Sequence, residues 1–161
     1  MRLELRPTTS ADLYAVSRLE QPTEVSRHLA TTGIAWHREV LADPANHHLL
    51  VLHDGRVAGF AVLVAGPRRS LELRRIVVRP ELKGRGVGRA LLRVTLAHAR
   101  ERGLRRIVLD VANGNARARK FYAANGFTDL DLPSPFVGFE VLRGYRVMSR
   151  TVGRAQPKST S

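Results

Sequence analysis

Three glycines at alternate positions form the part of the sequence best suited to bind an anion. Gly84, Gly86 and Gly88 lie between a run of β-branched residues, Ile76 to Val78, and an apolar helical pattern that begins after Gly88. Glycine permits backbone conformations that a Cβ disfavours, and it lets another molecule approach the main chain closely. A helix that starts in such a turn directs free N–H groups and the positive end of its dipole outward. We therefore predict a phosphate site at this helix start.

The spacing of these glycines narrows the kind of phosphate ligand. A dinucleotide fold uses G-x-G-x-x-G and a Walker loop uses G-x-x-x-x-G-K-[ST], and the order here, G-x-G-x-G, fits neither. The segment from Lys83 to Gly88 resembles the acetyl-CoA loop of the GNAT superfamily of N-acetyltransferases, [QR]-x-x-G-x-[GA]. It departs from that pattern at Lys83, which stands where Gln or Arg is usual. Lysine keeps the charge but lacks the forked donor geometry of arginine.

A second segment, about thirty residues further along, resembles another signature of the same superfamily. The signature is a strand followed by N-x-x-A-x-x-x-Y and a closing G-F. The strand is Ile107 to Val111, and Asn115, Ala118 and Tyr122 match the three fixed positions in register. Gly126-Phe127 matches the ending. Two signatures in the expected order are more specific than either one alone.

The resemblance covers roughly residues 3 to 151 and implies a fold as well as a ligand. It implies one α/β domain over residues 1–152. Its sheet is mixed and mostly antiparallel, with two splayed parallel strands and helices on both faces. Residues 153–161 are polar, and we expect them to form a disordered tail. The implied cosubstrate is acetyl-CoA. Its expected contacts are Ile76, Val77, Val78, Lys83, Gly84, Arg85, Gly86, Val87, Gly88, Arg89, Asn115, Ala118 and Tyr122.

Two side chains are candidates for the proton transfers that acetylation of an amine requires. The resemblance implies that Tyr122 is the general acid for the departing thiolate, the alternative being that it only packs beside its helical neighbours. Glu72 falls on the strand before the glycines, where some superfamily members carry a glutamate base. Its alternative is an ordinary strand residue paired with Arg74 or Arg75.

Backbone groups are implied for the remaining contacts. The thioester carbonyl gains negative charge in the transition state, and the resemblance implies the N–H of Val77 or Val78 as its donor. Main-chain groups near Ile76 to Val78 would pair with the pantetheine arm as an added strand does. Asn115 would bond the arm or order a water molecule.

The surrounding elements follow from periodicity and turn residues. Asp54-Gly55 predicts a tight hairpin. Thr9 to Asp12 is typical of a helix start. The expected strands are Leu3–Arg6, Leu49–His53, Arg56–Val64, Leu71–Arg79, Ile107–Val111 and Gly144–Arg150, with Phe136–Leu142 either a strand or a loop. The expected helices include pieces at Glu24–Leu29 and Ala35–Leu41. The strands that end near Val78 and begin near Val108 should be parallel, since a helix connects them.

The composition excludes several classes of site. There is no cysteine, which leaves direct transfer as the simpler route for an acyl group. We expect no metal site, because His47 and His48 are adjacent and face opposite sides of a strand. The net charge is +13, and residues 68–120 hold sixteen Lys and Arg against four acids, a net of +12. A basic surround would concentrate CoA, although solvated arginines are an alternative. We expect no nucleic-acid partner, because aromatic residues are only 6% and no binding motif is present.

The sequence therefore predicts an N-acetyltransferase that moves acetyl from acetyl-CoA directly to a primary amine of a small molecule, an amino acid or a peptide. One alternative acts on a protein N-terminus or lysine, and another is a catalytically idle CoA- or polyanion-binding module. The start of the chain is not a signal peptide and no apolar run is long enough to span a membrane, so we expect a cytoplasmic protein. The sequence leaves the acceptor open, as well as the choice between monomer and homodimer.

Overall fold

The computed structural model describes residues 2–20 and 33–153. Contacts along the chain divide it into two compact units. Unit 1 consists of Met1–Val64 and Arg74–Thr95, and unit 2 of Ala65–Leu73 and Leu96–Ser161. The predicted helix Glu24–Leu29 and residues 154–161 of the predicted tail lie outside the described residues. The single domain expected over residues 1–152 stays a prediction.

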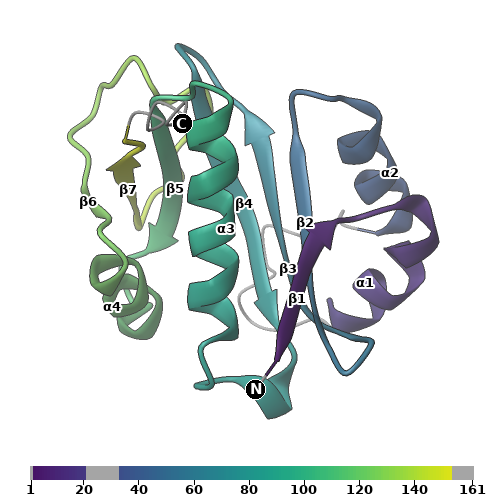
Figure 1. Ribbon diagram of the computed structural model, residues 1–161. Helices are drawn as coiled ribbons and strands as arrows, with labels where there is room; N and C mark the ends of the chain where they lie inside the picture. Colours follow the sequence, from purple (N-terminus) through teal and green to yellow (C-terminus); the bar gives the residue numbers. More distant parts are fainter. Residues whose placement is uncertain (1, 21–32, 154–161) are drawn as a thin grey trace, which may run out of the picture. The chain divides into compact units, whose positions relative to one another are not determined.

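Unit 1 contains an antiparallel set of strands (Figure 1). β1 (Leu3–Pro7) pairs with β2 (His47–His53), and β2 pairs with β3 (Arg56–Ala65). Asp54 and Gly55 join β2 to β3 with φ angles of 50° and 73°. These are the left-handed conformations that a two-residue hairpin turn requires, so the predicted hairpin is confirmed.

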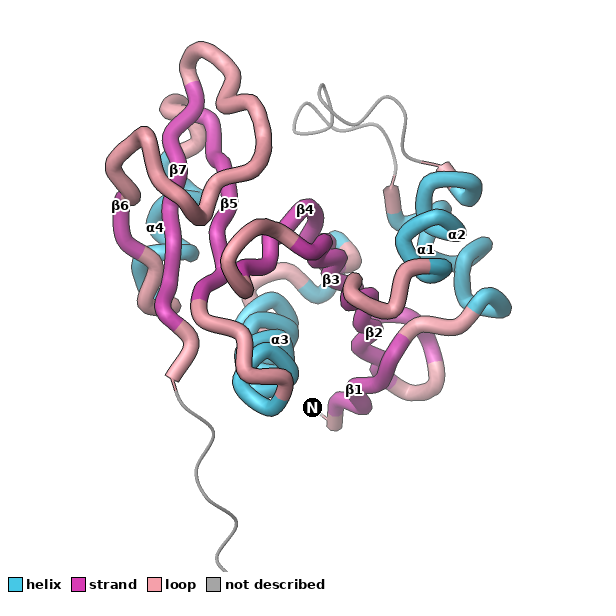
Figure 2. Tube along the Cα trace, turned by 90° about the horizontal axis from the view of Figure 1, so that it is seen from above, coloured by secondary structure: helices cyan, strands magenta, loops and turns pink. Residues whose placement is uncertain are grey.

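Two helices cover one face of these strands. The 3-10 turn η1 (Ser10–Asp12) leads into α1 (Leu13–Leu19), and α2 (Ile34–Ala42) includes the predicted piece Ala35–Leu41. Figure 2 shows α1 and α2 side by side. The core beneath them consists of the buried residues Val16, Val40, Leu50, Phe60 and Val62.

The opposite face of unit 1 receives the first part of α3 (Val87–Glu101). Phe60 points into the core under α1 and α2, so its neighbour Gly59 faces the other way. A Cβ added at Gly59 would lie 3.3 Å from Leu91 Cδ1 of α3. Glycine at this position therefore lets α3 lie close to the strand, and unit 1 has helices on both faces as expected.

Unit 2 contains the parallel pair of strands. Ser70, Leu71 and Glu72 at the start of β4 (Ser70–Val78) are in register with residues 106–108 of β5 (Arg106–Ala112). β5 pairs antiparallel with β7 (Tyr145–Thr151), which pairs with the two-residue strand β6 (Thr128–Asp129). α4 (Ala116–Ala124) follows β5. The predicted parallel pairing is confirmed.

The structure decides one alternative that the sequence left open in unit 2. Phe136–Leu142, which could be a strand or a loop from its sequence, is a loop. The additional strand is β6, which is too short to show an alternating pattern. The hydrogen-bonded strand order is β1-β2-β3-β4-β5-β7-β6, a mixed and mostly antiparallel sheet, so the predicted fold class is confirmed. Among the described residues, no helix is both long enough and apolar enough to cross a bilayer.

Candidate active site

The glycine loop in unit 1 depends on two left-handed residues. β4 ends before Pro80, which opens a 3-10 turn, η3 (Pro80–Leu82), and the glycines follow. Gly84 and Gly86 have φ angles of 79° and 86°. A Cβ added at either would meet nothing within 4 Å. The loop therefore needs glycine at these two positions for the backbone conformation, and the space beside them is open.

The first backbone amides of α3 come before the first hydrogen bond between successive turns of the helix. The Ala90 N–H donates to the Gly86 carbonyl at 3.0 Å, which closes the first helical turn. The amides of residues 86–89 come before that bond, and the first amides of a helix have no partner within it. Gly86, which directly precedes the helix, has no side chain that could cap them. These amides can accept an anion in the positive end of the helix dipole.

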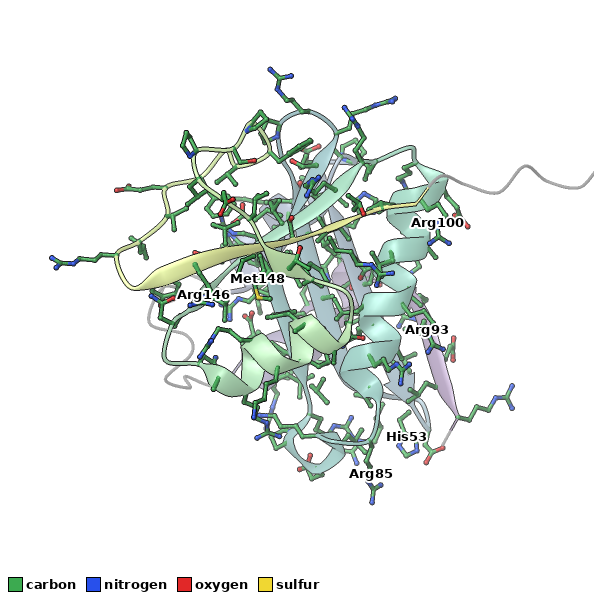
Figure 3. All side chains as sticks on the ribbon, turned by 90° about the vertical axis from the view of Figure 1, so that its left-hand side faces the viewer. His53, Arg85, Arg93, Arg100, Arg146 and Met148 are labelled. Atoms are coloured by element: carbon green, nitrogen blue, oxygen red, sulfur yellow. The ribbon has the colours of Figure 1, made fainter. Side chains whose placement is uncertain are left out.

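Basic side chains surround this helix start. Lys83, Arg85 and Arg89 are exposed, and Figure 3 shows Arg85 extending from the loop toward solvent. Val87 is only 1% exposed, so the first helical residue anchors the loop to unit 1. The loop thus combines a fixed backbone with exposed cations, which suits a polyphosphate.

The last residues of β4 divide their backbone groups between two edges. A Cβ at Gly59 would lie 2.5 Å from the Val77 carbonyl oxygen, and the Arg79 N–H donates to the Ala58 carbonyl at 2.7 Å. Residues 77 and 79 therefore face β3. Because successive residues of a strand direct their N–H and C=O groups to opposite edges, Ile76 and Val78 face away from β3.

The second signature lies in unit 2. Asn115 is the cap of α4, and its side-chain oxygen accepts a hydrogen bond from the Ala118 N–H at 3.1 Å. That oxygen therefore closes the helix start, whereas the sequence predicted a contact with the cofactor arm or a water molecule. The side-chain amide nitrogen is the group of Asn115 that retains the predicted role.

Tyr122 lies in the last turn of α4. Its ring is 5.4 Å from that of Phe121 and 5.6 Å from that of Phe127, measured between centroids. Burial, together with the charge of Asp110, raises the pKa of the Tyr122 phenol to about 12. The side chain therefore packs among aromatic neighbours, as the alternative interpretation expected, and also keeps its proton at neutral pH.

Asp110 was not among the predicted site residues. It lies on the same face of the sheet in unit 2 as Glu72. Glu72 is in register with Val108, and Asp110 follows two residues later on β5. Side chains at paired positions and at every second residue share a face, so both carboxylates project from one face. An acid within the apolar run Ile107 to Val111 is the signal that could have identified Asp110.

The predicted site residues therefore form two groups. Unit 1 holds Ile76, Val77, Val78, Lys83, Gly84, Arg85, Gly86, Val87, Gly88 and Arg89. Unit 2 holds Glu72, Asn115, Ala118 and Tyr122. Within each group the members come from adjoining turns and strands.

Comparison with known proteins places both groups inside one family model. The model described as "Acetyltransferase (GNAT) family" matches residues 11–127. An uncharacterized N-acetyltransferase of Mycobacterium tuberculosis (strain ATCC 25618 / H37Rv) is 40% identical over 89 residues, which are 55% of this chain and 57% of that protein. A streptothricin acetyltransferase of Streptomyces lavendulae is 40% identical over 82 residues, 50% of this chain and 43% of that protein. The chain thus matches about half the length of these relatives.

Two solved structures have the same fold. The ribosomal-protein-S18-alanine N-acetyltransferase from Escherichia coli superposes with a TM-score of 0.75 at 20% identity, over 99% of both chains. The PaiA N-acetyltransferase from Thermoplasma acidophilum, in complex with coenzyme A, superposes with a TM-score of 0.72 at 20% identity, over 94% of this chain and 99% of that one.

Proposed function

Since the chain belongs to the acetyltransferase (GNAT) family, we propose that it transfers acetyl from acetyl-CoA directly to a primary amine of a small molecule, an amino acid or a peptide. The observation that carries this proposal is the start of α3. Two left-handed glycines leave its first amides ahead of the helical bonding and beside open space. Such a helix start binds phosphate through its backbone.

The groups proposed to bind the cosubstrate lie in unit 1. In unit 1, the amides of residues 86–89 bind the pyrophosphate, and Lys83, Arg85 and Arg89 add positive charge around it. Also in unit 1, the edge of β4 that faces away from β3 bonds the pantetheine arm as an added strand would. Of the two donors expected from the sequence, the Val78 N–H points to that edge, so we assign the thioester carbonyl to Val78.

In unit 2, Tyr122 donates to the departing sulfur. A phenol with a pKa of about 12 keeps its proton throughout the physiological range, so the donor is present whenever the thiolate forms. The charge of Asp110 contributes to this raised pKa. Glu72 is the proposed proton acceptor for the amine, directly or through one water molecule. A free lysine-like amine titrates near pH 10 and must lose a proton before it attacks.

Two similar proteins bear on the class of acceptor. One relative is named for streptothricin, a small-molecule acceptor, and one structure of the same fold is named for an alanine of ribosomal protein S18. We therefore keep a protein N-terminus or lysine as the alternative acceptor, and a catalytically idle CoA- or polyanion-binding module as the alternative of another class. A cytoplasmic location and a monomer or homodimer stay predictions.

The experiment that tests the proposal is a thiol-release assay with a panel of amines and N-terminal peptides. The Tyr122→Phe substitution should lower kcat on any acceptor found by about 100-fold or more, the range typical of general acids, while CoA affinity changes less than twofold. Tyr14→Phe is the matched control, because Tyr14 is 66% exposed on α1. Unchanged turnover in Tyr122→Phe would remove the general-acid role, and no turnover with any amine would favour the idle module.

A further inference from the structure

A chain of polar side chains crosses the interior of unit 1. Thr8 Oγ1 lies 2.6 Å from His48 Nδ1, and His48 Nε2 lies 2.9 Å from His37 Nδ1. His37 Nε2 lies 2.9 Å from Glu20 Oε2, and the other carboxylate oxygen of Glu20 forms an ion pair with Arg75 Nε at 3.3 Å. We call these five residues the buried relay. Thr8 directly follows β1 and Glu20 directly follows α1, while the other three lie on α2, β2 and β4.

The relay is almost completely shielded from water. The His37 side chain is 0% exposed, Glu20 4% and Arg75 7%. Phe60 lies against both imidazoles, with ring centroids 5.7 Å from each. A buried carboxylate and a buried guanidinium are stable only when each has a partner, and the ion pair gives each of these two charges one.

One arrangement of protons satisfies all of these contacts when both imidazoles are neutral. The Glu20 carboxylate only accepts, so His37 donates to it from Nε2, and a neutral His37 then accepts at Nδ1. His48 must then donate from Nε2 and accept at Nδ1, where the Thr8 hydroxyl donates. In this arrangement both imidazoles are Nε2–H tautomers, and every hydrogen bond in the relay points toward Glu20.

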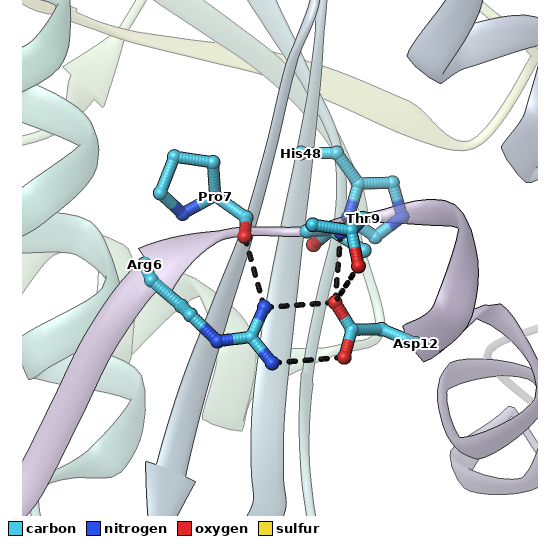
Figure 4. A network of polar contacts seen from close by, with 6 residues as sticks. Arg6, Pro7, Thr9, Asp12 and His48 are labelled. Carbon is cyan, nitrogen blue, oxygen red and sulfur yellow. Dashed lines mark hydrogen bonds and ion pairs between the residues drawn. The ribbon is translucent and has the colours of Figure 1, made fainter.

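Charged groups of β1, η1 and β4 act on the relay. Burial, and then the charge that His37 would carry, lower the pKa of His48 to about 3, while Asp12 of η1 opposes that shift. Asp12 is held by Arg6 through hydrogen bonds of 2.8 and 2.9 Å (Figure 4). On β4, burial lowers the pKa of Arg75, Glu20 opposes the change and Arg74 adds to it.

A proton taken up by the imidazole pair adds a positive charge beside Glu20. Glu20 then faces two cations, the imidazolium and Arg75, where it faced one before. The buried site gains a positive charge. The Glu20 carboxylate then interacts with both cations, which weakens its ion pair with Arg75. Arg75 directly precedes Ile76 to Val78, so a weaker hold on Arg75 affects the strand segment assigned above to the pantetheine arm.

We propose that Glu20, His37 and His48 are positioning residues that act on acetyl transfer through Arg75 and the end of β4, and that protonation of the imidazole pair releases this hold. The proposal rests on the proposed function only for the role of β4 in binding the cosubstrate arm. The relay itself and its effect on β4 can be measured without turnover.

The test uses His37→Gln in the full chain. A glutamine side chain can donate to Glu20 and accept from His48, but it has no ring nitrogen that can take up a proton. The acid limb of the kcat/KM profile for the amine should move at least one pH unit lower in His37→Gln. Amide hydrogen exchange of residues 74–78 should accelerate on acidification in the unsubstituted protein and not in His37→Gln. His53→Gln is the matched control, because His53 is 27% exposed and 3.5 Å from Asp54.

A second measurement keeps the proposal falsifiable if His37→Gln does not fold. Nitrogen-15 NMR of the unsubstituted protein at neutral pH should show both His37 and His48 as Nε2–H tautomers. Nδ1–H tautomers, or an acid limb and exchange rates identical in His37→Gln and His53→Gln, would overturn the proposal. Absence of turnover in the unsubstituted protein would instead contradict the proposed function, while the exchange and NMR results would still decide the role of the relay.

Discussion

Two regions of unit 1 use polar groups in opposite ways. The glycine loop at the start of α3 is exposed, and its backbone amides are left without partners in their own helix. The buried relay is shielded, and each of its members is bonded to or paired with the next. The loop can therefore bind an external anion, whereas the hydrogen bonds of the relay connect α1, α2 and the strands to one another. Changes in the loop should alter ligand affinity, and changes in the relay should alter stability and pH dependence.

The largest effect should appear when the relay is titrated. The pKa of His48 is about 3 in the folded protein, below its usual value of 6.5. The unfolded chain binds more protons between these values, so the stabilising contribution is complete above pH 6.5 and is lost as the pH falls toward 3. Between pH 7 and pH 4 the free energy of unfolding should fall by roughly 3 kcal/mol more than in His48→Gln. Urea unfolding at both pH values measures this change in the free energy of unfolding. The same change in the unsubstituted protein and in His48→Gln would contradict the claim that burial lowers the pKa of His48.

A smaller effect, on ligand affinity, should follow from a change in the loop. Gly84→Ala forces a Cβ into a left-handed conformation, which costs about 1–2 kcal/mol. If that strain is relieved by a shift of the loop, affinity for CoA should fall about tenfold or more. Gly144→Ala is the matched control, because Gly144 has a φ of 86° and nothing within 4 Å of an added Cβ, but lies before β7. Calorimetric titration with CoA measures the affinity of both variants. Equal losses of affinity in the two would contradict a specific role of the glycine loop in binding CoA.

The smallest effect should come from the start of α4, which resembles the relay more than the loop. Asn115 satisfies the Ala118 N–H with its own side chain. Asn115→Ala should lower the free energy of unfolding by about 1 kcal/mol through loss of the cap. Thermal unfolding measures that loss. The affinity of Asn115→Ala for CoA should differ less from that of the unsubstituted protein than the affinity of Gly84→Ala does. A larger loss of affinity than in Gly84→Ala would give Asn115 the direct ligand role that its sequence position first indicated.

The sequence predicted the parts of this molecule that depend on neighbouring residues. The hairpin at Asp54-Gly55, the end of β4 before Pro80 and the left-handed glycines all follow from local backbone chemistry. The proposed assignment of the thioester carbonyl to the N–H of Val78, and not of Val77, did not follow from the sequence. It depends on how the end of β4 lies against β3. β6 was missed because a two-residue strand has no period.

The relay could not be predicted for a different reason. Its five members are far apart in the sequence, and each has an ordinary position in its own element. His48 was considered only beside His47, where the alternation of a strand argues against joint metal binding. Only the packing of α1 and α2 on the strands brings Glu20, His37 and His48 together. Asp110 shows the same limit in unit 2, because its effect on Tyr122 depends on where α4 lies.

The central claim is that main-chain amides at the start of α3 bind the phosphates of the acyl carrier. Isothermal titration calorimetry of the full chain with CoA tests it most directly, with Gly84→Ala and Gly144→Ala measured in parallel. We predict saturable binding of one CoA per chain that weakens with added salt, is about tenfold weaker in Gly84→Ala and is unchanged in Gly144→Ala. No heat of association with the unsubstituted chain, or affinity unaltered by Gly84→Ala, would contradict the claim.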